Sequence, residues 1–312
     1  MAIAWCSSSS SSGSLRTLLH CAFKYSGRRR PGDYHEAVEQ MLRKHSHLHI
    51  RILSIDTAVD PALNVHSNDL WSFLVRVALD GRILGLLQGP PCETWTAARH
   101  HQTADEHGCP LPGPRPLRTT EDVWGLLHLR WSELDQLSVG NSLLLKGLFL
   151  ACLVTMKGGV TILEHPAMPH NDAISSIWRL GIVLLLTRPP YGPFRRTSIQ
   201  QWRYGGCGIK PTTLMYSNTM LPDILESNTD PAAQRPLQHL IGRQEDGTYR
   251  TAQAKEYPPR LNRAFACALD FSMQRWMLRT DNPLAEQYGL ELADKCTSTE
   301  YGTIYPDYQP QR

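Results

Sequence analysis

The alternation of short apolar runs with helical patterns is the feature that most constrains how this chain can fold. Apolar runs of strand length lie at 18–23, 49–55, 83–87, 160–163 and 182–186. Segments with helical patterns lie between them, at 33–44, 69–79, 142–156 and 173–180. This alternation predicts an α/β domain with a mostly parallel sheet and helices on both faces. In such sheets ligands bind beyond the carboxyl ends of the strands, so functional residues are expected there.

Composition narrows the class of protein without naming a partner. A hydrophobic fraction of 41% and a charged fraction of 20% are typical of a soluble protein with a buried core. The net charge of +3 is too small to indicate nucleic-acid binding on its own. Eight cysteines are scattered without a Cys-x-x-Cys pair, which argues against a zinc ribbon or a disulfide scaffold and favours a reducing, intracellular compartment.

The sequence contains neither a convincing signal peptide nor an obvious membrane span. Residues 1–6 are apolar but lack a basic flank, and the longest apolar runs, at 147–156 and 182–186, are shorter than a span requires. The cluster of His100, His101, His107 and Cys109 fits no zinc pattern, so no metal is expected. We therefore expect a soluble protein without a metal centre.

A thiol follows the expected strand 83–87. The run Gly-Pro-Pro-Cys occupies 89–92, and its two prolines stiffen the loop that carries Cys92. A free thiol held near backbone amides can have a lowered pKa and attack an electrophile. The alternative is a stiff loop with an inert cysteine.

A carboxyl group follows the neighbouring strand 160–163. Glu164 begins the run Glu-His-Pro, and a carboxyl group at the end of a buried strand is costly unless it is hydrogen-bonded or protonated. Glu164 therefore either has a chemical task or serves as a structural partner of an arginine or a helix end. If both strands are parallel neighbours, Glu164 and Cys92 face the same crevice.

Taken in order, these segments resemble the motifs of cytosine-5 methyltransferases. The run at 89–92 resembles the nucleophile motif of that family, and 163–166 resembles its Glu-Asn motif, with His165 where asparagine is common. The run at 200–205 partly matches a Gln-x-Arg-x-Arg motif, and 210–212 and 257–262 resemble late segments of divergent members. The resemblance implies a Rossmann-like fold that uses S-adenosylmethionine, and DNA as the partner.

The resemblance also implies roles for individual residues. Cys92 would add to carbon 6 of cytosine, Glu164 would contact ring nitrogen 3 and the exocyclic amine, and Arg203 would hold the base oxygen or steady Glu164. Substrate-binding residues are expected at Thr96, Arg99, His165 and Gln201. Cofactor-binding residues are expected at Tyr25, Ser26, Gly27, Asp56, Asp69, Leu70, Gly89, Pro90 and Asn262.

Five regions are expected along the chain. They are a disordered serine-rich end at 1–16, a catalytic core at 17–204, a reduced target-recognition region at 205–255, a helix returning to the core at 256–279 and a polar tail at 280–312. Arginines at 28–30 replace the glycine-rich cofactor loop of the family.

Three other functions stay open on the sequence. The same thiol and carboxylate could act on cytosine in RNA, or the fold could be an inactive relict that only binds. A cysteine hydrolase pairing Cys92 with His165 is a further alternative, although no oxyanion-hole motif accompanies it. A nuclear location is expected only if the substrate is DNA.

Overall fold

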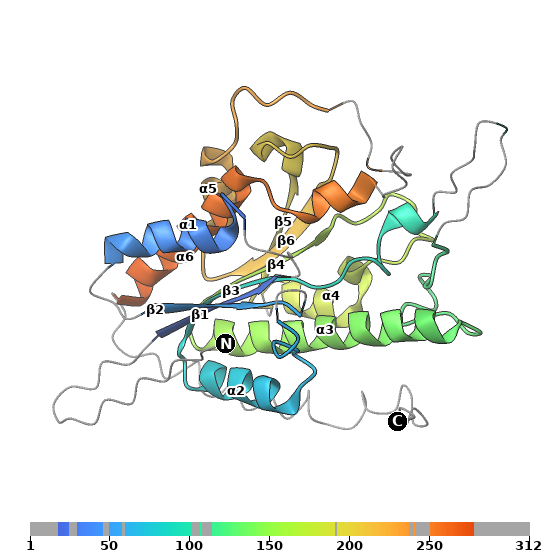
Figure 1. Ribbon diagram of the computed structural model, residues 1–312, viewed down its shortest axis with the longest axis horizontal. Helices are drawn as coiled ribbons and strands as arrows, with labels where there is room; N and C mark the ends of the chain where they lie inside the picture. Colours follow the sequence, from blue (N-terminus) through green and yellow to red (C-terminus); the bar gives the residue numbers. More distant parts are fainter. Residues whose placement is uncertain are drawn as a thin grey trace.

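The computed structural model describes residues 18–24, 30–45, 50–57, 60–100, 107, 114–190, 192–236, 240 and 250–277. Its centre is a six-stranded sheet in the order β2-β1-β3-β4-β6-β5 (Figure 1). The strands are β1 (Leu18–Lys24), β2 (Ile50–Ile55), β3 (Ile83–Gly89), β4 (Val160–Pro166), β5 (Arg195–Gln200) and β6 (Pro211–Ser217). The helices are α1 (Tyr34–Leu42), α2 (Asn68–Leu79), α3 (Trp131–Met156), α4 (Gly181–Thr187), α5 (Leu221–Ser227) and α6 (Pro259–Met277).

The arrangement of helices and strands confirms the α/β class. The sheet is mixed, so the predicted parallel pairing holds for only one part of it. β2, β1, β3 and β4 pair with one another in parallel, whereas β6 runs antiparallel to both β4 and β5. The connection 201–210 between β5 and β6 is short enough for an antiparallel hairpin, whereas parallel neighbours require a longer crossover.

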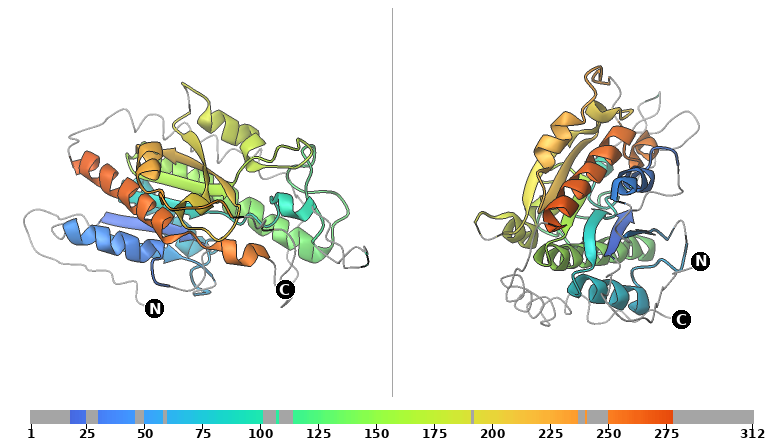
Figure 2. Two further views of the ribbon diagram at one scale, coloured as in Figure 1. Left: turned by 90° about the horizontal axis from the view of Figure 1, so that it is seen from above. Right: turned by 90° about the vertical axis from the view of Figure 1, so that its left-hand side faces the viewer.

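Helices cover both faces of the sheet (Figures 1 and 2). α6 contacts β3 and β4 on one face together with α1 and α5, and α3 contacts the same strands on the other face together with α2. β4 shows how the sequence fills both cores: Val160 and Ile162 pack in the cluster beneath α6, and Leu163 packs in the cluster beneath α3. This alternation sets the directions of the next two residues, Glu164 and His165.

The segment 173–187 differs from its prediction. Instead of a helix at 173–180 and a strand at 182–186, it forms a 3₁₀ turn at Ile177–Arg179 followed by α4. An apolar run of five residues cannot distinguish a strand from a helix. Val183 and Leu186 are buried at helical spacing while Leu185 is 64% exposed, so a one-sided helix satisfies the run.

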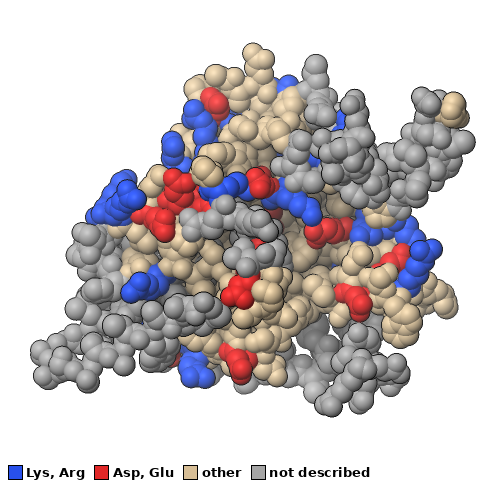
Figure 3. Space-filling model, in the orientation of Figure 1, with Lys and Arg blue, Asp and Glu red and all other residues tan. Residues whose placement is uncertain are grey.

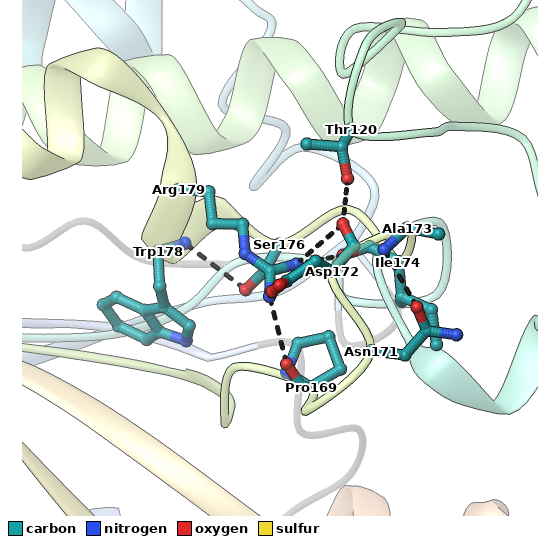
Figure 4. Close-up of polar contacts among 9 residues, drawn as sticks. All are labelled: Thr120, Pro169, Asn171, Asp172, Ala173, Ile174, Ser176, Trp178 and Arg179. Atoms are coloured by element: carbon teal, nitrogen blue, oxygen red, sulfur yellow. Dashed lines mark hydrogen bonds and ion pairs between the residues drawn. The ribbon is translucent and has the colours of Figure 1, made fainter.

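Arg179 explains why the residues before α4 form a loop. Its guanidinium donates to the carbonyl oxygens of Pro169, at 3.1 Å, and Ile174, at 2.6 Å, and pairs with the Asp172 carboxylate at 2.6 Å (Figure 4). The Thr120 hydroxyl donates to the carbonyl oxygen of Asp172. These bonds give the loop's polar backbone groups partners that a helix would otherwise supply.

α3 begins at Trp131, earlier than the predicted start at residue 142. Its first turn has one half of a capping box: the Glu133 carboxylate accepts from the Arg130 backbone N–H at 2.8 Å. The part of α3 before residue 142 is rich in polar residues, so an apolar pattern alone did not predict it. By length and composition alone α3 could cross a membrane, but more than half of its most apolar stretch is buried, as in a core helix.

The segment 205–255, expected to be a reduced target-recognition region, contains β6, which belongs to the central sheet. β6 pairs with β4 from Thr161 opposite Ser217 to Pro166 opposite Thr212. Its run of β-branched and aromatic residues after Pro211 is typical of a strand. The region therefore supplies part of the scaffold around Glu164.

Candidate active site

Cys92 follows β3, and Glu164 lies within β4, the parallel neighbour of β3. Gln88 of β3 lies opposite Leu163 of β4, so Gly89 is level with Glu164. A Cβ atom added to Gly89 would lie 2.9 Å from the Tyr257 hydroxyl oxygen and 3.7 Å from Glu164 Oε2. Glycine at this position therefore lets the phenol and the carboxylate approach the backbone that leads to Cys92.

Glu164 is buried, with 7% of its surface exposed, and both of its oxygens have partners. The Tyr257 hydroxyl donates to Oε2 at 3.0 Å, and the Lys210 ammonium lies 3.5 Å from Oε1. The Gln201 amide is also 3.5 Å from Oε1 and donates to the Thr212 hydroxyl at 3.0 Å. A cation and two neutral donors thus hold the carboxylate beside the end of β3.

The Cys92 thiol is half-buried and is not in a disulfide. Burial, followed by the negative charges of Glu164 and Glu93, raises its pKa to about 12, while the Lys210 ammonium opposes the rise. This direction is opposite to the lowered pKa that a thiol near backbone amides can have. The thiol is the resting form, and attack requires a change in its electrostatic surroundings.

His165 points to the opposite face of the sheet from Glu164, because successive residues of a strand alternate. It is 1% exposed, with the rings of Trp95 and Trp178 edge-on at 6.3 and 6.2 Å. Burial, then the charges of Arg118 and Lys210, lowers its pKa to about 3. Neither ring nitrogen hydrogen-bonds another described residue, so the Cys92–His165 pair of a hydrolase is not formed. His165 is therefore a buried core residue, and its contact with substrate stays a prediction.

Arg118, which the sequence did not single out, fixes the segment after Cys92 against α3. It is 1% exposed and donates to the Thr94 hydroxyl at 2.7 Å and to the Asn141 side-chain oxygen at 2.7 Å. Its guanidinium carbon also lies 3.7 Å from the ring centroid of Trp95. Because a buried arginine needs several acceptors, this network holds the segment in one arrangement.

Two residues expected to bind substrate stabilise the loop after Cys92. Arg99 donates to the carbonyl oxygens of Glu93, at 2.5 Å, and Arg115, at 3.0 Å, and to the Gln136 side chain at 2.8 Å. Thr96 accepts from the backbone N–H two residues later. These side chains shape the loop, and substrate contact by them stays a prediction.

The residues of the run 200–205 diverge in direction. Gln201 is buried beside Glu164, whereas Arg203 is 44% exposed and pairs with Glu226 of α5 at 3.0 Å. The run forms a 3₁₀ turn at Gln201–Tyr204, in which residues three apart share a face, so Gln201 and Tyr204 point inward and Arg203 outward. Arg203 consequently does not steady Glu164. Lys210 and Tyr257, whose segments were noted without roles, take that place.

Asn262, expected to bind cofactor, joins α6 to the loop before α1. It is fully buried, and its amide donates to the carbonyl oxygens of Gly32 at 2.8 Å and Tyr257 at 3.2 Å. These bonds fix the backbone of Tyr257 and thereby help to place its hydroxyl on Glu164.

The residues expected at the cofactor site fit S-adenosylmethionine only in part. Asp56 is buried after β2, Asp69 is exposed in the first turn of α2, and Leu70 packs against the core. Tyr25, Ser26 and Gly27 lie outside the described residues. Gly89 and Pro90 border a recess of about 20 Å³, whereas ligand pockets usually measure some hundreds of Å³. This recess alone is too small to hold a nucleoside cofactor.

A larger cavity lies on the α4 side of the fold. It measures about 270 Å³, and Thr120, Trp124, Ser175, Arg179 and Ile182 are among its lining residues. Among its described lining residues, the one cation is the Arg179 guanidinium, which already bonds to its own loop (Figure 4). None of the expected site residues that the structure describes borders this cavity.

Surface charge and comparison with known proteins leave the substrate unassigned. Acidic and basic side chains are interspersed on the face seen in Figure 3, so charge alone does not indicate a nucleic-acid surface there. Within the described residues no group of three His, Cys, Asp or Glu side chains could hold a metal ion; His101 and Cys109 lie outside them. Comparison with models of known protein families and with curated protein sequences finds no significant match.

Proposed function

We propose that this chain is a cytosine-5 methyltransferase acting on DNA, with the Rossmann-like fold of enzymes that use S-adenosylmethionine. The observation that carries the proposal is the position of Glu164 in β4, level with the end of β3, the parallel neighbour that leads to Cys92. The strand order supports it: the chain proceeds outward from β1 to β2 and then continues from β3 on the other side. Ligands of open α/β sheets bind where the strand order reverses in this way.

The chemistry assigned to these residues is addition to an aromatic ring. The Cys92 sulfur forms a bond to carbon 6 of cytosine, and the electrons of the 5–6 double bond move towards carbon 5, which becomes nucleophilic. Glu164 accepts from the exocyclic amine, and in its protonated form it donates to ring nitrogen 3, where negative charge develops. S-adenosylmethionine, when bound, supplies the methyl group. Loss of the carbon 5 proton and of the sulfur then restores the ring and the free thiol.

Substrate binding provides the change that the resting thiol requires. Glu164 is the largest electrostatic contributor to the raised pKa of Cys92. A base that donates hydrogen bonds to Glu164 offsets this negative charge and leaves Lys210 as the dominant neighbour of the sulfur. The reactivity of Cys92 should therefore increase when the base binds. The base must first leave the DNA stack, at a cost of a few kcal/mol.

Methyl transfer to defined nucleic acids tests this function. The full chain, Cys92→Ala and Glu164→Gln are incubated with labelled S-adenosylmethionine and with cytosine-containing DNA or RNA, and 5-methylcytosine is measured. The proposal expects label in DNA from the wild type and none from Cys92→Ala. Label in RNA alone would move the substrate to RNA, and equal labelling by Cys92→Ala would exclude Cys92 as the nucleophile.

A second candidate function is binding without catalysis on the same fold. The recess of about 20 Å³ beside Gly89 and the raised pKa of Cys92 favour this candidate. Calorimetry with S-adenosylmethionine separates the two functions. Heat of binding that is weakened by Asp56→Ala supports the enzyme, and no heat at any cofactor concentration supports the binding protein.

A further inference from the structure

Lys210 occupies a specific position at the candidate active site. It immediately precedes β6, the antiparallel neighbour of β4, and its ammonium donates to the carbonyl oxygen of Ala254 at 2.9 Å. The same nitrogen lies 3.5 Å from Glu164 Oε1 and 5.8 Å from the ring centroid of Tyr257. Its side chain is 19% exposed, so its charge is only partly screened by solvent.

The cation expected in this position from the sequence was Arg203, whose side chain instead pairs with Glu226 in solvent. Among the described residues, the charged groups that act on the Cys92 thiol are Glu164, Glu93 and Lys210, and only the lysine is positive. Tyr257, which bonds to the same carboxylate, is the other titratable group coupled to Cys92. A single lysine therefore contacts Glu164 and acts electrostatically on Cys92.

We propose that Lys210 is the positioning cation of the active site: its ammonium orients the Glu164 carboxylate and favours the thiolate of Cys92. This inference deepens the proposed function, on which it rests for the roles of Cys92 and Glu164. The ion pair aligns one carboxylate oxygen and Tyr257 aligns the other, so the base meets a carboxylate of fixed orientation. When the base engages Glu164, the lysine charge remains to stabilise the sulfur anion that attacks.

The pH dependence of Cys92 alkylation measures this charge without DNA or cofactor. The full chain is treated with iodoacetamide across a range of pH, and each cysteine peptide is quantified by mass spectrometry. The exposed Cys207 serves as the internal reference in every sample. Lys210→Met removes the charge at similar volume, Lys210→Arg keeps it, and Lys157→Met, at the end of α3, controls for net charge.

We expect Lys210→Met to slow alkylation of Cys92 about tenfold at a given pH relative to Cys207, which corresponds to a shift of about one pH unit. Lys210→Arg should restore most of the rate, and Lys157→Met should match the wild type. A Cys92 profile unchanged in folded Lys210→Met would overturn the proposal. So would a loss of rate that Lys210→Arg fails to restore, since such a loss reflects packing and not charge.

Glu164→Gln provides the second measurement if Lys210→Met does not fold. Removing the carboxylate leaves Lys210 as the main charge near the sulfur, so alkylation of Cys92 should become faster at a given pH. An unchanged profile in Glu164→Gln would contradict the proposed electrostatic coupling. Methyl-transfer assays then separate the two proposals. Shifted alkylation profiles without methyl transfer would keep the role of Lys210 and refute the proposed enzyme. Methyl transfer with unshifted profiles would support the enzyme and refute the role of Lys210.

Discussion

The hydrogen bond between Tyr257 and Glu164 gives the most quantitative prediction about the site. The Tyr257 hydroxyl donates to Glu164 Oε2 at 3.0 Å, and both side chains are buried. Tyr257→Phe removes this donor and keeps the aromatic ring, including its edge-on contact with Phe265 at 5.5 Å between centroids. The substitution therefore tests the bond rather than the packing.

The expected loss of stability follows from the hydrogen bond that the Glu164 carboxylate loses. Hydrogen bonds to charged groups contribute about 1.5–3 kcal/mol, and a buried acceptor that loses its donor also bears the cost of its desolvation. The Lys210 ammonium contacts the other oxygen of Glu164, so it does not replace the phenol. We expect Tyr257→Phe to lower the free energy of unfolding by about 2 kcal/mol.

Urea unfolding followed by circular dichroism measures the loss. With a slope near 2 kcal/mol per molar, a typical value, the midpoint should fall by about 1 M. Tyr204→Phe is the matched control, because this buried tyrosine makes no hydroxyl hydrogen bond with another described residue. A midpoint for Tyr257→Phe equal to that of Tyr204→Phe would refute the claim that the phenol supports Glu164.

Three further predictions concern the surroundings of the site. The pKa of His165 is about 3 in the folded protein and near 6.5 in the unfolded chain, so the contribution of this residue to stability is complete above pH 6.5 and is lost as the pH falls towards 3. Between pH 7.5 and pH 5, the free energy of unfolding measured in urea should fall by about 2 kcal/mol less in His165→Phe than in the wild type. An equal fall in both proteins would contradict the lowered pKa. Gly159→Ala places a Cβ atom over the carbonyl oxygen of Ile83 and should cost about 1–3 kcal/mol by urea unfolding, whereas Gly181→Ala, with open space around it, should change stability by less than about 1 kcal/mol. Arg203→Ala removes one exposed ion pair, so it should lower the free energy of unfolding by less than about 1 kcal/mol and should not slow methyl transfer. A large loss of activity would show that Arg203 acts in the active site.

The strands on one side of the sheet could be predicted from sequence because they are continuous apolar runs. β3, for example, is buried along nearly its whole length, and its run stands between clear turn residues. β5 could not be predicted in this way, because it is an edge strand with both arginines exposed and has no apolar pattern. The run of α4 carries an apolar signal that fits either element, and only tertiary packing decides between them.

In the candidate site, too, positions set by neighbouring residues could be predicted, whereas contacts between distant segments could not. Cys92 and Glu164 could be placed together because each follows a predicted strand. The direction of His165, away from Glu164, follows from strand alternation once the faces of the sheet are known. Lys210 and Tyr257 reach Glu164 from just before β6 and just before α6, and a single sequence does not show how close such segments come in the fold.

Covalent trapping on fluorinated DNA tests the central claim most directly. The full chain and its Cys92→Ala variant are incubated with S-adenosylmethionine and a duplex containing 5-fluorocytosine, and the denatured products are analysed by mass. Fluorine at carbon 5 prevents the elimination that would release the sulfur, so a working site stays bonded to the base. The proposed function predicts a denaturation-resistant adduct on the peptide that contains Cys92, and none in the variant. An adduct on another cysteine, or none on fluorinated DNA or RNA, would contradict it.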